Sequence, residues 1–171
     1  MVAIAAVAAV LVWSIAGCGG GSGSSAEAPT GTKPVEVSEA ELSALADKLD
    51  QPVYWAGLQP DTKLELTQSK DGRIYVRYLT GNAKIGVRKA GYLTVGTYPF
   101  KDAYTALQAV SQTPGATVEN VADSGLAVSK PDQPTSVYLA YPDEDFQVEV
   151  YDPDAAQAMD LVTSGAVQPV D

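Results

Sequence analysis

Residues Arg73–Leu79 read RIYVRYL, and residues Thr135–Tyr141 read TSVYLAY. In each stretch a large apolar or aromatic side chain recurs at every second position, which is the period of a β-strand with one buried face. A second alternating run follows each of them, Tyr92–Tyr98 in the first case and Phe146–Tyr151 in the second. This pattern predicts an antiparallel sheet that is buried on one side.

The phase of the alternation divides the side chains of this sheet between two faces. One set is expected to face the core, beneath the helices: Ile74, Val76, Tyr78, Leu93, Val95, Val137, Leu139, Tyr141, Phe146, Val148 and Val150. The opposite set, which we call the tyrosine–arginine face, is expected to face solvent: Arg73, Tyr75, Arg77, Tyr92, Thr94, Tyr98, Tyr138, Gln147, Glu149 and Tyr151.

Other segments complete the predicted set of elements. Ser38 and Glu41 have the spacing of a capping box, which indicates a helix start. Asp152 is the expected N-cap of the last helix. Helical periods cover residues 39–49, 100–112 and 153–164. Further strand patterns cover residues 53–56, 63–68, 117–121 and 126–129, and the sequence SKDG at 69–72 predicts a hairpin turn.

The order of these elements repeats along the chain. IYVRY at 74–78 matches VYLAY at 137–141, and DAYTALQAV at 102–110 matches DAAQAMDLV at 154–162. The predicted fold class is therefore α+β, an antiparallel sheet with helices on one face, built from a duplicated unit of one helix and four strands. Its parts are repeat one at about 38–99, repeat two at about 100–152 and a final helix at 153–164.

The N-terminal segment is apolar and uncharged. Val2–Gly17 is shorter than the roughly 20 residues that a membrane-spanning helix needs, and it is typical of the apolar part of a signal peptide. It departs from that pattern because no Lys or Arg precedes it. Ile15-Ala16-Gly17-Cys18 resembles the lipobox of bacterial lipoproteins. The resemblance implies that the signal is cut before Cys18, whose sulfur then carries a diacylglycerol.

We accordingly expect a signal peptide at residues 1–17, a flexible tether at 18–37 and a globular domain at 38–171. The tether is rich in Gly and Ser. Membrane lipid, attached through Cys18, is the expected anchor. The alternative is a short uncleaved membrane anchor with an incidental cysteine. In both cases the domain is expected outside the cytoplasmic membrane, anchored to it.

Composition excludes several classes of function. The net charge of -10 makes nucleic acid an unexpected partner, since phosphate binding needs an excess of Lys and Arg. The chain has no histidine and one cysteine, which excludes Ser-His-Asp and Cys-His catalysis, His or Cys zinc sites and an internal disulfide. No phosphate-binding loop is present. We therefore expect no cofactor and no metal.

Carboxylate and lysine chemistry is left open by these exclusions. The acidic stretch Asp143–Asp145 offers oxygen atoms to calcium but lacks the spacing of a calcium loop. No spacing of carboxylates indicates the pair that a glycosidase needs. Ser69-Lys70 and Ser129-Lys130 are adjacent in predicted turns, which is more typical of turn chemistry than of a Ser–Lys dyad.

The two repeats differ most in the loop between their matched strands. Repeat two has the turn Asp143–Asp145, whereas repeat one has the twelve residues Thr80–Gly91, TGNAKIGVRKAG. Long loops often carry binding sites, and tyrosine and arginine are enriched where proteins bind partners. The candidate ligand-binding residues are Arg73, Tyr75, Arg77, Lys84, Arg88, Lys89, Tyr98 and Tyr138. The alternative is that tyrosine and arginine form cross-strand pairs that stabilise the sheet.

These observations favour a non-catalytic, lipid-anchored domain of the cell envelope. It is expected to bind a protein or an anionic envelope polymer through the basic loop and the tyrosine–arginine face. The alternative is a carboxylate-dependent hydrolase that acts on cell-wall material. The string RIYVRYL…YLTVGTYP…PTSVYLAYP also resembles uncharacterised secreted domains of high-GC Gram-positive bacteria over most of residues 50–165. That resemblance implies a domain type and no activity.

Overall fold

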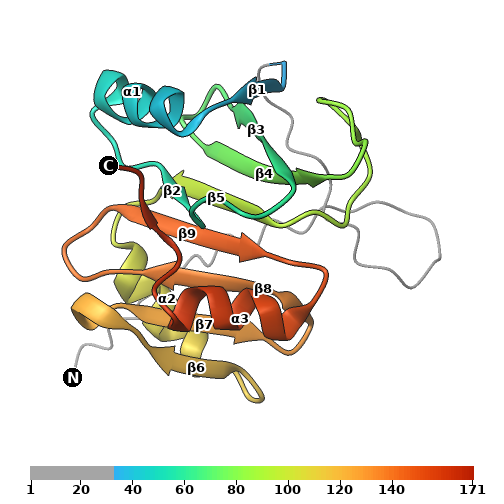
Figure 1. Ribbon diagram of the computed structural model, residues 1–171. Helices are drawn as coiled ribbons and strands as arrows, with labels where there is room; N and C mark the ends of the chain where they lie inside the picture. The colour runs from blue at the N-terminus through green and yellow to red at the C-terminus, as the bar shows by residue number, and fades with distance from the viewer. Residues whose placement is uncertain (1–32) are drawn as a thin grey trace, which may run out of the picture.

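Eight strands form one antiparallel sheet in residues 33–171, the part of the chain that the computed structural model describes (Figure 1). The strand order is β1-β3-β4-β5-β9-β8-β7-β6, and β2 and β10 form a second, two-stranded sheet. Three α-helices complete the α+β fold. The predicted signal peptide, Cys18 and most of the predicted tether lie outside the described residues.

The elements occur in the order expected. The strands are β1 Val35–Val37, β2 Tyr54–Trp55, β3 Thr62–Gln68, β4 Ile74–Thr80, β5 Thr94–Pro99, β6 Thr117–Asn120, β7 Leu126–Lys130, β8 Gln133–Ala140, β9 Phe146–Tyr151 and β10 Gln168–Pro169. The helices are α1 Glu39–Leu49, α2 Ala103–Ser111 and α3 Ala155–Thr163, with a short 3-10 turn at Ala122–Ser124. Every predicted strand and helix is present, with ends shifted by at most about three residues.

Two strands were missed by the sequence patterns. β1 takes the last three residues of the predicted tether, Val35–Val37, and pairs with β3. A segment of three residues is too short to show an alternating pattern. It forms a strand because it pairs with the otherwise free edge of β3. β10 has only two residues and likewise forms a strand because it pairs with β2, so its own sequence shows no strand pattern.

Helix starts follow local hydrogen bonding. The capping box is confirmed: the Glu41 amide donates to Ser38 Oγ at 3.3 Å, and the Ser38 amide donates to Glu41 Oε2 at 2.7 Å. The predicted N-cap of α3 is wrong. Asp154 caps the helix by accepting from the Ala156 amide at 2.9 Å, while Asp152, two residues earlier, accepts from the Asp154 amide. Asp152 instead lines a pocket with side chains of β4 and α3.

The predicted core face of the sheet is buried. All of its residues except Phe146, which is half-buried, belong to one hydrophobic cluster. That cluster also includes side chains from α1, α3 and the β2 region, among them Leu42, Trp55, Leu161 and Val162. The sheet contributes Ile74, Val76, Tyr78, Val95, Val137, Leu139, Val148 and Val150, with Leu93 and Tyr141 packed at the margin. The alternation in the sequence therefore identified the buried side correctly.

The expectation that all helices cover one face is wrong. α3 packs Ala158 and Leu161 on the core face, whereas α2 packs Ala103 and Leu107 against Leu126, Val128 and Ala140, whose side chains point to the opposite face. Figure 1 shows α3 in front of β7 and β8 and α2 behind them. The reason is that β7 and β8 are apolar on both faces, so each face needs a cover.

Strand registers agree between the two halves of the large sheet. Val76 lies opposite Val95 in the β4–β5 pair, and the matched residues Leu139 and Val148 lie opposite each other in the β8–β9 pair. β5 and β9 are themselves antiparallel partners at the centre of the sheet. The two halves thus meet at β5 and β9.

Candidate functional site

The tyrosine–arginine face is not the open surface that the sequence predicted. α2 covers its β7–β8 end, and residues 81–93, the loop between β4 and β5, are bound to it at the other end. The face has three parts: a buried ion pair under the loop, the basic side chains of the loop, and a tyrosine cluster between the loop and α2.

The ion pair joins Glu65 on β3 to Arg77 on β4. The two residues are direct cross-strand partners, and Arg77 Nη1 lies 2.6 Å from Glu65 Oε1. Glu65 is 0% exposed and Arg77 is 7% exposed, so water screens this pair very little. Burying two charges is costly unless hydrogen bonds satisfy their remaining atoms.

Those remaining atoms are satisfied by the backbone of the loop. Arg77 donates to the carbonyl oxygens of Val87 at 3.2 Å and Lys89 at 3.1 Å, and the Gly86 amide donates to Glu65 Oε2. The Arg77 guanidinium also lies 5.5 Å from the ring centroid of Tyr92. Arg77 therefore holds the loop in place, and its guanidinium is occupied by Glu65 and by the loop backbone.

The three other predicted cations of this loop are on its outer side. Lys84, Arg88 and Lys89 are all exposed, in contrast to Arg77 beneath them. Their backbone is held at Gly86, Val87 and Lys89 by the buried pair. The arrangement presents three cations from an anchored loop.

The tyrosine cluster surrounds the carboxylate of Glu149 on β9. Tyr98 donates to Glu149 Oε2 at 2.6 Å, and Ser136 donates to Glu149 Oε1 at 2.9 Å. Burial and the nearby Glu149 charge raise the pKa of Tyr98 well above the usual value of 10. The Tyr98 ring lies over Gly96, where a Cβ atom would be 2.5 Å from the tyrosine oxygen.

The other predicted residues of this face belong to the same cluster. Tyr75 meets the Tyr98 ring edge-on at 5.6 Å, and Arg73 lies 5.7 Å from the Tyr98 centroid. Tyr138 donates to Gln133 and has Lys130 above its ring. Burial raises the pKa of Tyr75 and, together with the Glu149 charge, that of Tyr138. The structure thus brings Arg73, Tyr75, Tyr98 and Tyr138 together as cross-strand contacts, which fits the stabilising alternative.

The acidic turn is part of the framework that starts α2. Asp145 accepts from the Asp102 amide through its side chain and from the Phe100 amide through its carbonyl, and Glu144 accepts from the Tyr54 hydroxyl at 3.1 Å. Among residues 33–171, no group of three or more His, Cys, Asp or Glu side chains is placed to hold a metal ion. Ser69 donates to Asp71, and Ser129 donates to the Pro134 carbonyl, so both hydroxyls serve turns.

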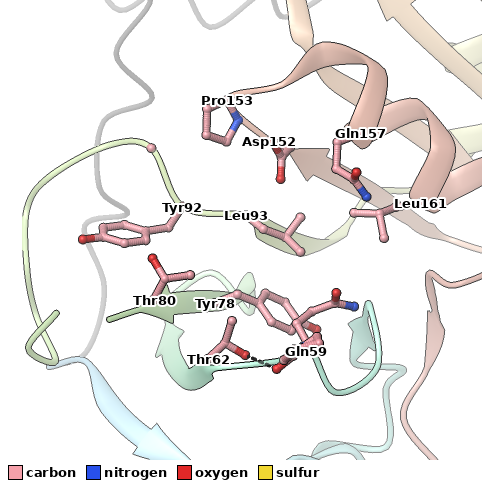
Figure 2. Close-up of a pocket in the computed structure, with 12 residues that line it drawn as sticks. Gln59, Thr62, Tyr78, Thr80, Tyr92, Leu93, Asp152, Pro153, Gln157 and Leu161 are labelled. Atoms are coloured by element: carbon pink, nitrogen blue, oxygen red, sulfur yellow. Dashed lines mark hydrogen bonds between the residues drawn. The ribbon is translucent and has the colours of Figure 1, made fainter. Parts of the chain in front are cut away.

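Sequence patterns missed a pocket of about 380 Å³ on the other side of the loop (Figure 2). It lies between residues 59–62, the end of β4, residues 91–93 and the start of α3. Figure 2 shows Asp152 and Gln157 on one side and Gln59, Thr62 and Tyr78 on the other, with Tyr92 at one end. No local signal marked it, because its walls come from segments up to about 100 residues apart.

Asp152 is the charged group of this pocket. Burial raises its pKa, the amide hydrogen bond from Asp154 counteracts this, and the neighbouring Asp154 charge raises it further. The rim opposite is held by two hydrogen bonds, from Gln59 Nε2 to the Ala56 carbonyl and from Thr62 Oγ1 to the Gln59 carbonyl at 2.8 Å. The pocket walls are therefore largely pre-formed.

Helices of the described chain are too short or too polar to cross a bilayer. Comparisons of the chain with protein-family models, with curated proteins and with solved structures find no match.

Proposed function

We propose that this chain is a non-catalytic, lipid-anchored domain of the cell envelope that binds an anionic envelope component through Lys84, Arg88 and Lys89. The observation that carries the proposal is the anchoring of a cationic loop by the buried Glu65–Arg77 pair. An anchored loop loses little conformational freedom on binding, so more of the attraction appears as affinity.

Charge distribution supports an anionic partner. Residues 63–101 carry eight basic and two acidic side chains, whereas residues 102–171 carry one basic and twelve acidic ones. A local basic patch on an acidic protein attracts a phosphate- or carboxylate-bearing polymer and orients the rest of the domain away from it. The predicted lipid at Cys18 would keep the domain close to such a polymer.

A binding role rather than catalysis is supported by the state of the tyrosine cluster. Its phenols have raised pKa values and already hydrogen-bond or pack against one another. A phenol that resists ionisation is a poor base or nucleophile at neutral pH.

We also propose that the large sheet arose by duplication of a helix-plus-four-strand unit. Support comes from the equal registers of the β4–β5 and β8–β9 pairs. The different faces taken by α2 and α3 would then be a later divergence.

The binding proposal is tested with a fluorescently labelled glycerol-phosphate polymer and the full-length chain in neutral detergent. We expect the Lys84→Gln/Arg88→Gln/Lys89→Gln variant to bind at least about tenfold more weakly, because three charge-assisted contacts are lost. The matched control neutralises three exposed lysines elsewhere, Lys48, Lys70 and Lys101. Equal losses in both variants would show non-specific attraction and reject the loop as the site.

The anchoring proposal needs its own test. Cys18→Ser should release the chain from the membrane fraction and abolish incorporation of labelled fatty acid. A variant that stays in the membrane and whose label is unchanged would contradict lipidation at Cys18.

A further inference from the structure

The pocket in Figure 2 has no part in the proposed contact with an anionic polymer, and its chemistry is different. All of its lining residues belong to the described part of the chain, and among them Asp152 alone is charged. A negative group repels phosphates and carboxylates. The ligand of this pocket is therefore not the anion expected at the loop.

Five polar side chains of three kinds contribute to the walls. Two carboxamides, Gln59 and Gln157, two hydroxyls, Thr62 and Thr80, and the Asp152 carboxylate line the space. A carboxamide both donates and accepts, a hydroxyl does the same, and a carboxylate accepts strongly from O–H groups. This set matches a molecule with several adjacent hydroxyl groups.

Flat apolar surfaces lie between these polar groups. Tyr92, Pro60, Pro153, Leu93 and Leu161 supply them. Such surfaces pack against the C–H face of a sugar ring while its hydroxyls reach the polar groups. A volume of about 380 Å³ is near the lower end of the range of about 300–1,000 Å³ for ligand pockets, which suits a molecule of one or two rings.

The aromatic end of the pocket is held by Arg77. The Arg77 guanidinium packs against the Tyr92 ring, and Arg77 is itself fixed by its ion pair with Glu65. The Tyr78 amide also donates to the Leu93 carbonyl at 3.0 Å, which holds the adjoining backbone against β4. Tyr92 is therefore held in place before any ligand arrives.

We infer that this pocket binds an uncharged saccharide of one or two rings, with Asp152 and Gln157 as its main hydrogen-bonding partners and Tyr92 as its packing surface. A ligand of this size on a partly open pocket is expected to bind with a dissociation constant on the order of 1 mM.

Saturation-transfer difference NMR on the full-length chain tests this inference, in a detergent without a sugar headgroup. The probes are glucose, N-acetylglucosamine, maltose and N,N′-diacetylchitobiose at millimolar concentration. We expect transfer to at least one of them, and a loss of about tenfold in affinity in Asp152→Asn and in Gln157→Ala. Asp152→Asn keeps the oxygen that accepts from the Asp154 amide, so the turn before α3 is preserved.

The matched controls are Asp160→Asn and Gln108→Ala, exposed positions on α3 and α2. They should bind like the wild type, as should the variant lacking the three loop cations, which separates this pocket from the proposed polymer site. Two-dimensional amide spectra check that each variant is folded. Absence of transfer to every probe, or wild-type affinity in both Asp152→Asn and Gln157→Ala, would overturn the inference.

Discussion

Glu65 and Arg77 face each other across β3 and β4, and their buried side chains form a 2.6 Å ion pair whose other atoms bind the backbone of residues 86–89. One pair of charges thus connects the sheet, the basic loop and, through Tyr92, the pocket.

Removing one member of this pair is expected to destabilise the fold strongly. Arg77→Ala leaves the Glu65 carboxylate buried without its cation, which typically costs about 3–5 kcal/mol. The control is Lys63→Ala on β3, the strand that carries Glu65. Lys63 lies 3.7 Å from Glu36 in an exposed ion pair, and its loss is expected to cost less than about 1 kcal/mol. Urea denaturation measures both, and equal costs would contradict a special role for the buried pair.

Replacing both Glu65 and Arg77 distinguishes the effect of the pair on global stability from its effect on the order of the loop. Glu65→Leu/Arg77→Met removes both buried charges, so this variant should be more stable than Arg77→Ala. It also removes the partners of Gly86, Val87 and Lys89, so amide hydrogen exchange over residues 81–93 should be at least about tenfold faster. Unchanged protection of that segment would show that other contacts hold the loop.

Gly96 is expected to tolerate no side chain. In Gly96→Ala the new Cβ would be 2.5 Å from the Tyr98 oxygen, so the ring must turn away and lose its hydrogen bond to Glu149. We expect a cost of about 1–3 kcal/mol. In the Tyr98→Ala background the same substitution should cost much less, and a double-mutant cycle measures the difference. An additive cycle would contradict this contact.

Stability is expected to fall above about pH 10. The folded-state pKa values of Tyr54, Tyr75, Tyr78, Tyr98, Tyr138 and Tyr141 are raised by burial above the unfolded value of 10. Their contribution is complete below pH 10 and is lost as the pH rises toward the folded-state values, because the unfolded chain ionises first. Absorbance at 295 nm and circular dichroism should therefore change together.

Glu149→Gln tests the electrostatic part of this effect. Without the carboxylate charge the pKa of Tyr98 and of Tyr138 should decrease, so part of the tyrosine ionisation should occur at lower pH. Glu119→Gln on β6 is the control, since Glu119 is exposed. Identical titration curves for the two variants would mean that burial alone sets these values.

Local patterns predicted much of this fold but little of the candidate site. The alternation through Ile74, Val76 and Val148 reported the buried face, because side-chain direction in a strand depends only on neighbouring residues. The loop that carries Lys84, Arg88 and Lys89 stood out by its length, which exceeds what a hairpin needs. The ion pair of Arg77 with Glu65 and the loop above it were not predicted, because alternation shows which face a side chain is on and not what covers that face.

By itself, then, the sequence determined the succession of strands and helices, the buried phase of the sheet and the capping of α1, all of which depend on contacts within a few residues. Tertiary structure alone decided that α2 and α3 cover opposite faces, that Glu65 and Arg77 hold the loop down, and that Gln59, Tyr92 and Asp152 line one pocket. These features depend on contacts between different elements of the fold, and a local sequence pattern carries no information about such contacts.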